Sequence, residues 1–589
     1  MTSIITLMSA SQVASLSTKQ IASLQTSDIA ALSPTQAQAL RSVQIAAMST
    51  SDVVQISDAA MSLFNQSQLS GFSTNDVANL TLGQAASLTT GSTGQISELS
   101  NAQFSALTAS QVATIAANLT NSQIGALSTG QAAGLSASVI GNLSTGQTGA
   151  ISTAAIATFN SAQIAALGAN LTNAQVGAVS TSALSGLSAS TLGNFSTAQV
   201  DAISTKDVAA LNSTQLGGLS STQVQSLGSA QVAVLQYQQV AAMATNFSTA
   251  QVGSLTTSQA AGLSATVIGN LSTAQTSAIS TAAIASFNSS QIAALGDNLT
   301  NAQVGAVSTS ALSGLSASTL GNFSTAQVDA ISTKDIAALN STQLGGLSST
   351  QVQSLGSAQV SALSSTQVGT IASNFSTAQV GALTTAQAAG LSATVIGNLS
   401  TAQTSAISTA AIATFNSAQI AALGANLTNA QISAVTTSAL AGLSASTLGN
   451  FSTAQVDAIS TKDVAALNST QLGGLSSTQV QSLGSAQVSA LSSTQVGTIA
   501  SNFSTAQVGA LTTSQAAGLS ATVIGNLSTA QTSAISTAAI ASFNSAQIAA
   551  LGANLTTAQV TAVSTSALAG LVASTLGNFS TAQVDAIST

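Results

Sequence analysis

The sequence of 589 residues contains no Cys, no His and no Trp, and it has a single Pro and a single Tyr. Without Cys there is neither a disulfide nor a thiolate ligand for a metal ion. Without His, the many Ser hydroxyls lack the usual base that activates a nucleophile. We therefore expect no enzyme activity and no cofactor.

Charge is also scarce, since Asp, Glu, Lys and Arg make up 3% of the chain and only five residues are basic. Proteins commonly carry about 25% charged residues. A basic groove for nucleic acid and a polybasic patch for lipid headgroups are excluded. Apolar stretches are interrupted every few residues by Ser, Thr, Gln or Asn, so we expect no membrane insertion.

What the sequence has in abundance is a unit of eight residues, close to Ser-Thr-x-Gln-Val-x-x-Leu. Residues 324–371 show it without a gap, as STAQVDAI STKDIAAL NSTQLGGL SSTQVQSL GSAQVSAL SSTQVGTI. Short periods of this kind are typical of solenoids, in which each repeat contacts only its neighbours. We call this unit the octad.

Each octad carries the signals of a short helix. Ser324 is an N-cap candidate and Gln327 lies three residues later, which is the spacing of a capping box. Phe323 and Val328 stand at the two positions of a hydrophobic staple. The only proline, Pro34, directly follows Ser33 and so falls at the first helical position, where a missing N–H is harmless.

A single long helix does not suit this repeat, because eight residues are about 2.2 helical turns and the apolar stripe would drift around the cylinder. We therefore predict an all-α solenoid of very short helices built from 8-residue repeats. The alternative is a β-solenoid with Gln and Asn ladders, which Thr and Val favour. The three-residue spacing of the apolar positions favours helices.

Two regions differ in regularity. Residues 1–99 hold degenerate octads, with a shift of frame at Thr89-Thr90-Gly91, and we expect them to form an N-terminal cap region. Residues 100–589 form a regular solenoid with a superrepeat of 128 residues, marked by the string LGNF that ends at Phe195, Phe323, Phe451 and Phe579. We expect this pattern to continue beyond Thr589.

Each superrepeat contains fifteen octads and two inserted tetrads. Four residues are about one helical turn, so we expect each tetrad to lengthen one helix by a turn. The tetrads occupy residues 116–119, 168–171, 244–247, 296–299, 372–375, 424–427, 500–503 and 552–555.

The only acidic clusters that recur form three pairs, each with a Lys between the two acids. A weak calcium site is one interpretation, and the other is a helix-dipole acid beside a solvated acid. The second is favoured, because calcium takes six to eight oxygen ligands from a dedicated loop. The pairs are Asp201 with Asp207, Asp329 with Asp335, and Asp457 with Asp463.

Near-identical long repeats, richness in Ser, Thr, Ala and Gly, absence of Cys and lack of an N-terminal signal make the chain resemble large repetitive bacterial surface proteins and adhesins. That resemblance implies an extracellular or cell-surface location, reached by type I secretion.

We expect a structural protein that associates with its own copies into a fibre, sheath or surface layer, with a cell-surface anchor or a glycan as a further partner. An adhesin stalk that presents a tip outside this chain is the alternative. An ice-binding solenoid, suggested by the Ser and Thr skin, is a more distant one.

Overall fold

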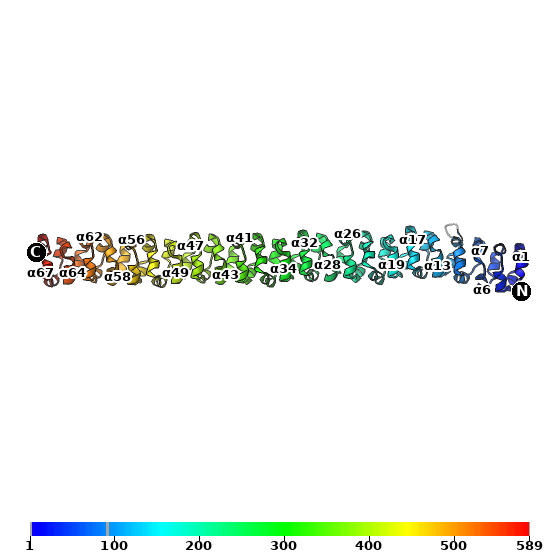
Figure 1. Ribbon diagram of the computed structural model, residues 1–589, viewed down its shortest axis with the longest axis horizontal. Coiled ribbons are helices and arrows are strands. Elements are labelled where there is room, and N and C mark those ends of the chain that lie inside the picture. Colours follow the sequence, from blue (N-terminus) through cyan, green and yellow to red (C-terminus); the bar gives the residue numbers. More distant parts are fainter. Residues whose placement is uncertain (1–2, 90–93, 588–589) are drawn as a thin grey trace. The chain divides into compact units, whose positions relative to one another are not determined.

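The computed structural model describes residues 3–89 and 94–587. Over these ranges the chain forms 68 α-helices and nine 3-10 turns and contains no strand (Figure 1). The prediction of an all-α solenoid is confirmed, and the β-solenoid is excluded for the part of the chain described. Contacts divide the chain into two units, Met1–Asn298 and Leu299–Thr589, and each is considered by itself.

A representative octad is helix α38 (Thr325–Asp329). The hydroxyl of the N-cap Ser324 accepts a hydrogen bond from the Gln327 amide at 3.2 Å, and the Ser324 amide donates to Gln327 Oε1 at 2.7 Å. Phe323 and Val328 are both buried beside this cap. The capping box and the apolar pair are thus present as predicted. Pro34 likewise occupies the first turn of α4 (Pro34–Gln38).

The helices are arranged in coils of three elements. Within each unit, an element packs against the one that lies three places further along the chain. In unit 1, α22 (Ala189–Gly193) packs on α25 (Ser213–Gly217), and α25 packs on α28 (Tyr237–Met243). In unit 2, α38 packs on α41 (Ser349–Ser354) in the same way. Each coil is therefore three-sided and rests only on the coils before and after it.

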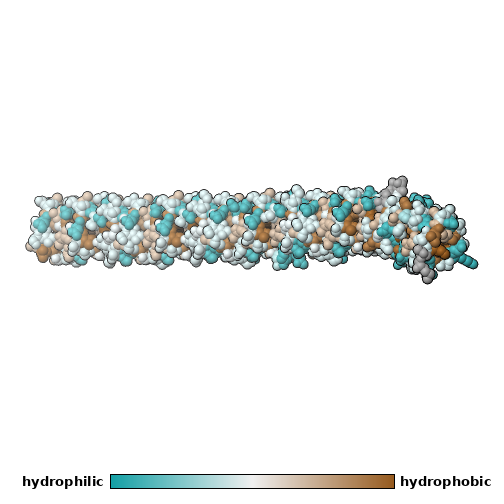
Figure 2. Space-filling model, turned by 45° about the vertical axis from the view of Figure 1, so that its right-hand side comes forward, coloured by the Kyte–Doolittle hydropathy of each residue, from teal (hydrophilic) through white to brown (hydrophobic). Residues whose placement is uncertain are grey.

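The core of every coil comes from two positions of the octad. In α41 these are Val352 at the fifth octad position and Leu355 at the eighth, and both are buried. At the first, second, third and sixth positions of this octad, residues 348–350 and Gln353 are exposed. On the face that Figure 2 shows, apolar residues appear only as small separate patches among polar and weakly polar ones.

The tetrads differ from the expectation. The helix before a tetrad has seven residues, but it then stops, and the tetrad forms a separate 3-10 turn. In unit 1, η3 (Gly168–Asn170) follows α19 (Ser161–Leu167) and packs on α17 (Thr145–Ala150), three places earlier. The turn therefore takes the place of a whole helix on one side of the coil, and α19 packs directly on α21 (Thr181–Ser185).

Counting the tetrad turns as elements gives a superrepeat of seventeen elements, for instance from η2 (Ala116–Asn118) to η4 (Ala244–Asn246). Seventeen is not a multiple of three. Equivalent octads of successive superrepeats in one unit therefore lie on different sides of the coil.

The degenerate octads near the N-terminus follow the same rule. The 3-10 turn η1 (Ile4–Leu7) packs on α3 (Thr26–Ala30), and α4 packs on α7 (Asp58–Met61). The boundary at residues 99–100 and the capping role of residues 1–99 stay predictions. Thr90 and Gly91 of the predicted frame shift lie outside the described residues.

None of the helices in the described ranges has both the length and the apolar character that crossing a bilayer requires. The expectation of no membrane insertion agrees with this finding.

Candidate functional site

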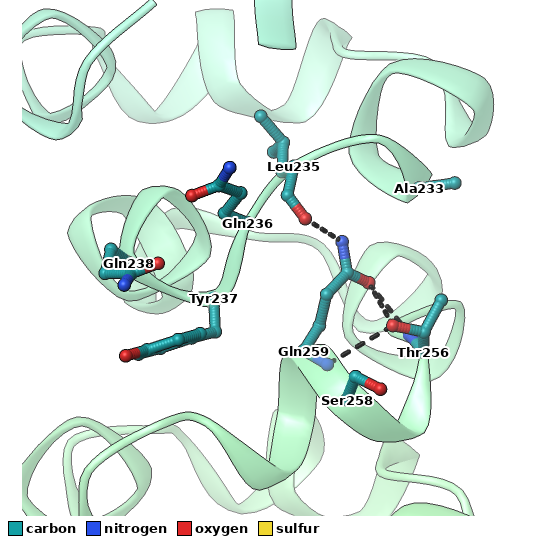
Figure 3. A pocket seen from close by; sticks show the side chains of 8 residues that line it. All are labelled: Ala233, Leu235, Gln236, Tyr237, Gln238, Thr256, Ser258 and Gln259. Atoms are coloured by element: carbon teal, nitrogen blue, oxygen red, sulfur yellow. Dashed lines mark hydrogen bonds between the residues drawn. The ribbon is translucent and has the colours of Figure 1, made fainter.

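The residue that joins one coil to the next is the Gln at the fourth octad position. Gln259 illustrates it in Figure 3. Its Oε1 accepts a hydrogen bond from the amide of the N-cap Thr256 at 2.9 Å. Its Nε2 donates to the carbonyl oxygens of Val232 and Leu235 in the preceding coil, both at 2.8 Å. One side chain thus caps its own helix and holds the end of another.

The same double role recurs along both units. Where Nε2 makes this contact, its acceptors include the last apolar residue of an octad 24 to 31 residues earlier, and the Gln side chains that make it are buried. We call this contact the Gln staple. Among the residues that form it are Gln199, Gln215, Gln223, Gln231, Gln239 and Gln251 in unit 1 and Gln343, Gln351, Gln359, Gln367, Gln379 and Gln387 in unit 2.

The Gln staple explains how such short helices persist. Helices of four to seven residues are unstable alone in water, and the last carbonyls of each have no partner inside the helix. The next coil supplies that partner through Nε2. A buried carbonyl that loses its donor costs about 1–3 kcal/mol, so each staple fixes the register of two coils.

Several octads carry Asp at this position, and there the direction of the contact is reversed. Asp207 is buried, and its Oδ2 accepts from the N-cap Ser204 hydroxyl at 2.5 Å. Its Oδ1 accepts from the Thr181 hydroxyl of the preceding coil at 2.6 Å. Asp335 accepts from Thr309 and Asp463 from Thr437 in the same manner, each at 2.5 Å. The acid therefore also joins two coils, as an acceptor instead of a donor.

The partner acids of the predicted pairs lie in a different environment. Asp201, Asp329 and Asp457 are exposed and stand at the last residue of their helices, whereas Asp207, Asp335 and Asp463 are buried and hydrogen-bonded. Among the residues described, no three acidic side chains come together in a way that would hold a metal ion. A calcium site at these pairs stays a prediction, and the contacts of the buried acids support the interpretation as helix-dipole residues.

The Gln staple is not made at Gln123. The Nε2 atom of Gln123 is buried and has no hydrogen-bond partner. In the equivalent contact of the next superrepeat, Gln251 donates to Val224 and Leu227 at 2.8 and 2.9 Å. The corresponding acceptors for Gln123 are Ile96 and Leu99, which instead line a cavity of about 430 Å³ beside it. This coil junction is therefore open.

Sequence reasoning assigned the Gln only to capping and missed its contact with the preceding coil. A signal was nevertheless present. A capping box accepts Glu as readily as Gln, and a helix N-terminus favours the negative charge of Glu. A chain that places Gln there in octad after octad and never Glu has a use for the Nε2 donor.

The ALTTAQ repeat family matches the chain over residues 208–245, 336–373 and 464–501. These are equivalent stretches of three successive superrepeats, and each contains a run of octads and ends inside a tetrad that begins with Ala. The match supports a repeat protein. No curated protein matches the chain.

Proposed function

We propose that this chain is a structural protein without catalytic activity, of the kind found among large repetitive bacterial surface proteins. It lies outside the cell or on its surface and associates with its own copies into a fibre, sheath or layer. The observation that carries the proposal is an outer surface of Ser, Thr, Ala, Asn and Gln that is almost free of charge, repeated over coils whose polar stapling is internal.

Association between copies of the chain is favoured because there is little charge repulsion between them. Net charge keeps proteins apart in solution, and here the formal charge is −8 over 589 residues. Side-chain hydroxyls and amides offer both donors and acceptors, so two such surfaces can form hydrogen bonds in several registers.

The coil order constrains the form of the assembly. In unit 2, α39 (Thr333–Ala338) and α54 (Thr461–Ala465) are equivalent octads that lie seventeen elements apart. They therefore face different directions, and no single side repeats with every superrepeat. This favours lateral contacts on all three sides, as in a bundle or a sheath, over pairing along one seam.

Electron microscopy and sedimentation of the purified full chain test the proposal. We expect ordered assemblies whose amount rises with protein concentration and changes little between low and high salt, because few ionic contacts are available to screen. Chains that stay single and monodisperse at the highest attainable concentration would overturn the proposal.

A charged variant sharpens the test. Ala198, Ala326 and Ala454 are exposed residues in the first turns of equivalent helices, where an acidic side chain is compatible with the helix dipole. Replacing all three by Glu should leave the helix content unchanged and disperse the assemblies. The matched control replaces the same three residues by Ser, which should leave assembly intact.

A further inference from the structure

The superrepeats are nearly identical, yet one short segment departs from its counterparts in the later copies. Residues 233–238 read AVLQYQ, where the next two copies read SALSST. Four small residues of those copies are replaced by larger ones. The changes are Val234 for Ala362 and Ala490, Gln236 for Ser364 and Ser492, Tyr237 for Ser365 and Ser493, and Gln238 for Thr366 and Thr494, and in addition Ala233 replaces Ser361 and Ser489.

Three of the substituted residues, Gln236, Tyr237 and Gln238, line one pocket. It has a volume of about 320 Å³ and is completed by Ala233 and Leu235 and by Thr256, Ser258 and Gln259 of the following coil. Figure 3 shows Gln236, Tyr237 and Gln238 on one side of the pocket and the three residues of α30 (Thr257–Ala261) and its cap on the other.

The base of the Tyr237 side chain packs tightly against a neighbouring backbone, while the rest of the residue is partly exposed to solvent. The backbone of Gly262 approaches it so closely that a methyl group there would lie 2.4 Å from the Tyr237 Cγ. Tyr237 as a whole nevertheless remains 45% exposed, and the neighbouring Val234 is 43% exposed. In the next superrepeat the residue equivalent to Tyr237 is Ser365, and it packs against Gly390. The aromatic ring is therefore an addition to the coil surface that the fold itself does not require.

The polar groups around the ring are uncharged. No acidic or basic residue lines the pocket. Among the residues drawn in Figure 3, the hydrogen bonds join Gln259 to Thr256 and to Leu235. The N-cap side chain of Gln236 makes no hydrogen bond to its helix, unlike Ser364, which accepts from the Gln367 amide at 3.3 Å. The backbone N–H of Gln236 donates to Gln239 Oε1 at 2.6 Å, and the side-chain amide of Gln236 is left for a ligand.

We propose that this pocket binds a neutral carbohydrate. An aromatic ring has a negative face, which attracts the C–H bonds on the flat side of a sugar ring. The hydroxyls at the rim of a sugar need both donors and acceptors, and side-chain amides supply both. An uncharged pocket gives no attraction to phosphate or carboxylate ligands.

The size of the pocket favours a small ligand over a protein. Stable protein interfaces bury more than about 1,000 Å² in total, whereas pockets for small molecules begin at about 300 Å³. The pocket lies at that lower limit, which suits one or two sugar rings on the Tyr237 platform. The inference goes beyond the proposed function, because the pocket is present whether or not the chains assemble.

Because of its composition, the chain carries its own fluorescent reporter of sugar binding. Tyr237 is the only Tyr and there is no Trp, so intrinsic tyrosine fluorescence reports on this pocket alone. The full chain is titrated with neutral sugars built from glucose, galactose, mannose and N-acetylglucosamine, as single and linked rings. At least one of them should change the fluorescence in a saturable way. If none does, the proposal is wrong.

Variants with equilibrium dialysis of the labelled sugar then assign the contact. Tyr237→Ser restores the residue of the other copies, so it should fold normally and bind about tenfold more weakly or not at all. Tyr237→Phe keeps the ring and should bind within a few-fold of the original chain. Ser365→Ala, at the equivalent place of the next superrepeat, is the control and should change nothing.

Two results would contradict the inference. One is binding by Tyr237→Ser that is as tight as that of the original chain. The other is tyrosine fluorescence that changes with protein concentration alone, which would make the pocket a contact between copies. Assembly is followed separately by sedimentation, so a failure of the proposed function and a failure of this inference are distinguishable.

Discussion

Two junctions in unit 1, equivalent in sequence, differ in one contact. At the second, Gln251 donates to the carbonyl oxygens of Val224 and Leu227, and the coils are closed. At the first, Gln123 has the same place in its octad, but its Nε2 has no partner and a cavity of about 430 Å³ lies beside it. Comparing the two junctions separates the contacts that form the helix within one octad from the contacts that join its coil to the preceding one.

The comparison shows that capping and stapling are independent. Gln123 still caps its own helix, since its Oε1 accepts from the Thr120 amide at 2.8 Å. α14 (Asn121–Gly125) is therefore present without the staple. The local signals suffice to form the helix, and the Gln staple adds the register between coils.

The largest expected effect comes from turning a staple donor into an acceptor. Gln251→Glu keeps the capping oxygen but places a carboxylate against two buried carbonyls. We expect a local cost of about 3 kcal/mol or more at neutral pH. The buried Glu has a pKa above its unfolded value, so the loss shrinks as the pH falls through the folded-state pKa and the protonated acid can donate again.

Hydrogen exchange read by mass spectrometry measures this effect, because a solenoid does not unfold in one two-state step. The peptides that contain residues 233–243 differ in sequence from the other copies and can be assigned without ambiguity. Exchange in these peptides should quicken at pH 7 and approach the original rate at acidic pH. Equal protection at pH 7 would show that the donor is not needed.

A second comparison concerns the two kinds of tetrad turn. η7 (Gly424–Asn426) begins with Gly424 at φ 48°, whereas η6 (Ala372–Asn374) begins with a buried Ala372 at φ −56°. A Cβ at Gly424 would meet nothing within 4 Å. Gly424→Ala should therefore cost about 2 kcal/mol through backbone strain alone.

The reciprocal change provides the control. Ala372→Gly removes a buried methyl group but imposes no strain, so it should cost about 1 kcal/mol. Hydrogen exchange around Ile432, which is distinctive in sequence, measures the first variant, and exchange around η6 measures the second. A smaller loss for Gly424→Ala than for Ala372→Gly would contradict the role assigned to the positive φ.

These comparisons also show how far the sequence could lead. The capping box, the position of Pro34 and the apolar pair of each octad were predictable because they depend on residues three to five apart. The order of three elements per coil was not, because the contacts that define it join residues 24 to 34 apart. Nothing in one octad indicates which later octad will rest on it.

The tetrads and the acids illustrate the same limit. A Gly at the start of four tetrads and an Ala at the start of the other four were visible in the sequence, and they indicate two backbone solutions. That either solution replaces a whole helix depends on packing with a distant element. Likewise, Asp207 was recognised as a helix-dipole acid, but its partner Thr181 lies 26 residues away.

A smaller loss of stability is expected when a buried Asp loses the hydrogen bond that it accepts from the preceding coil. Thr309→Val removes the hydroxyl that donates to the buried Asp335 and keeps the shape of the side chain. We expect a loss of about 1.5 kcal/mol, because Asp335 retains the hydrogen bond from Ser332 at 2.5 Å. Thr309→Ser keeps the hydroxyl and should lose much less. Faster exchange in α36 (Thr309–Ser313) and α39 checks the difference, and identical exchange in both variants would refute the contact.

The smallest effect is expected where the staple is already open. Gln123→Leu removes a buried donor that has no partner and adds apolar volume toward Ile96, Leu99 and Phe104, which line the cavity. It loses the capping oxygen, at about 1 kcal/mol, and regains a similar amount by relieving the unpaired donor and by apolar burial. The net change should be close to zero.

Gln251→Leu is the matched variant, and it should cost about 2 kcal/mol because two carbonyls lose their donor. Equal losses in the two variants, measured by hydrogen exchange in the flanking helices, would mean that the junction at Gln123 is stapled in solution.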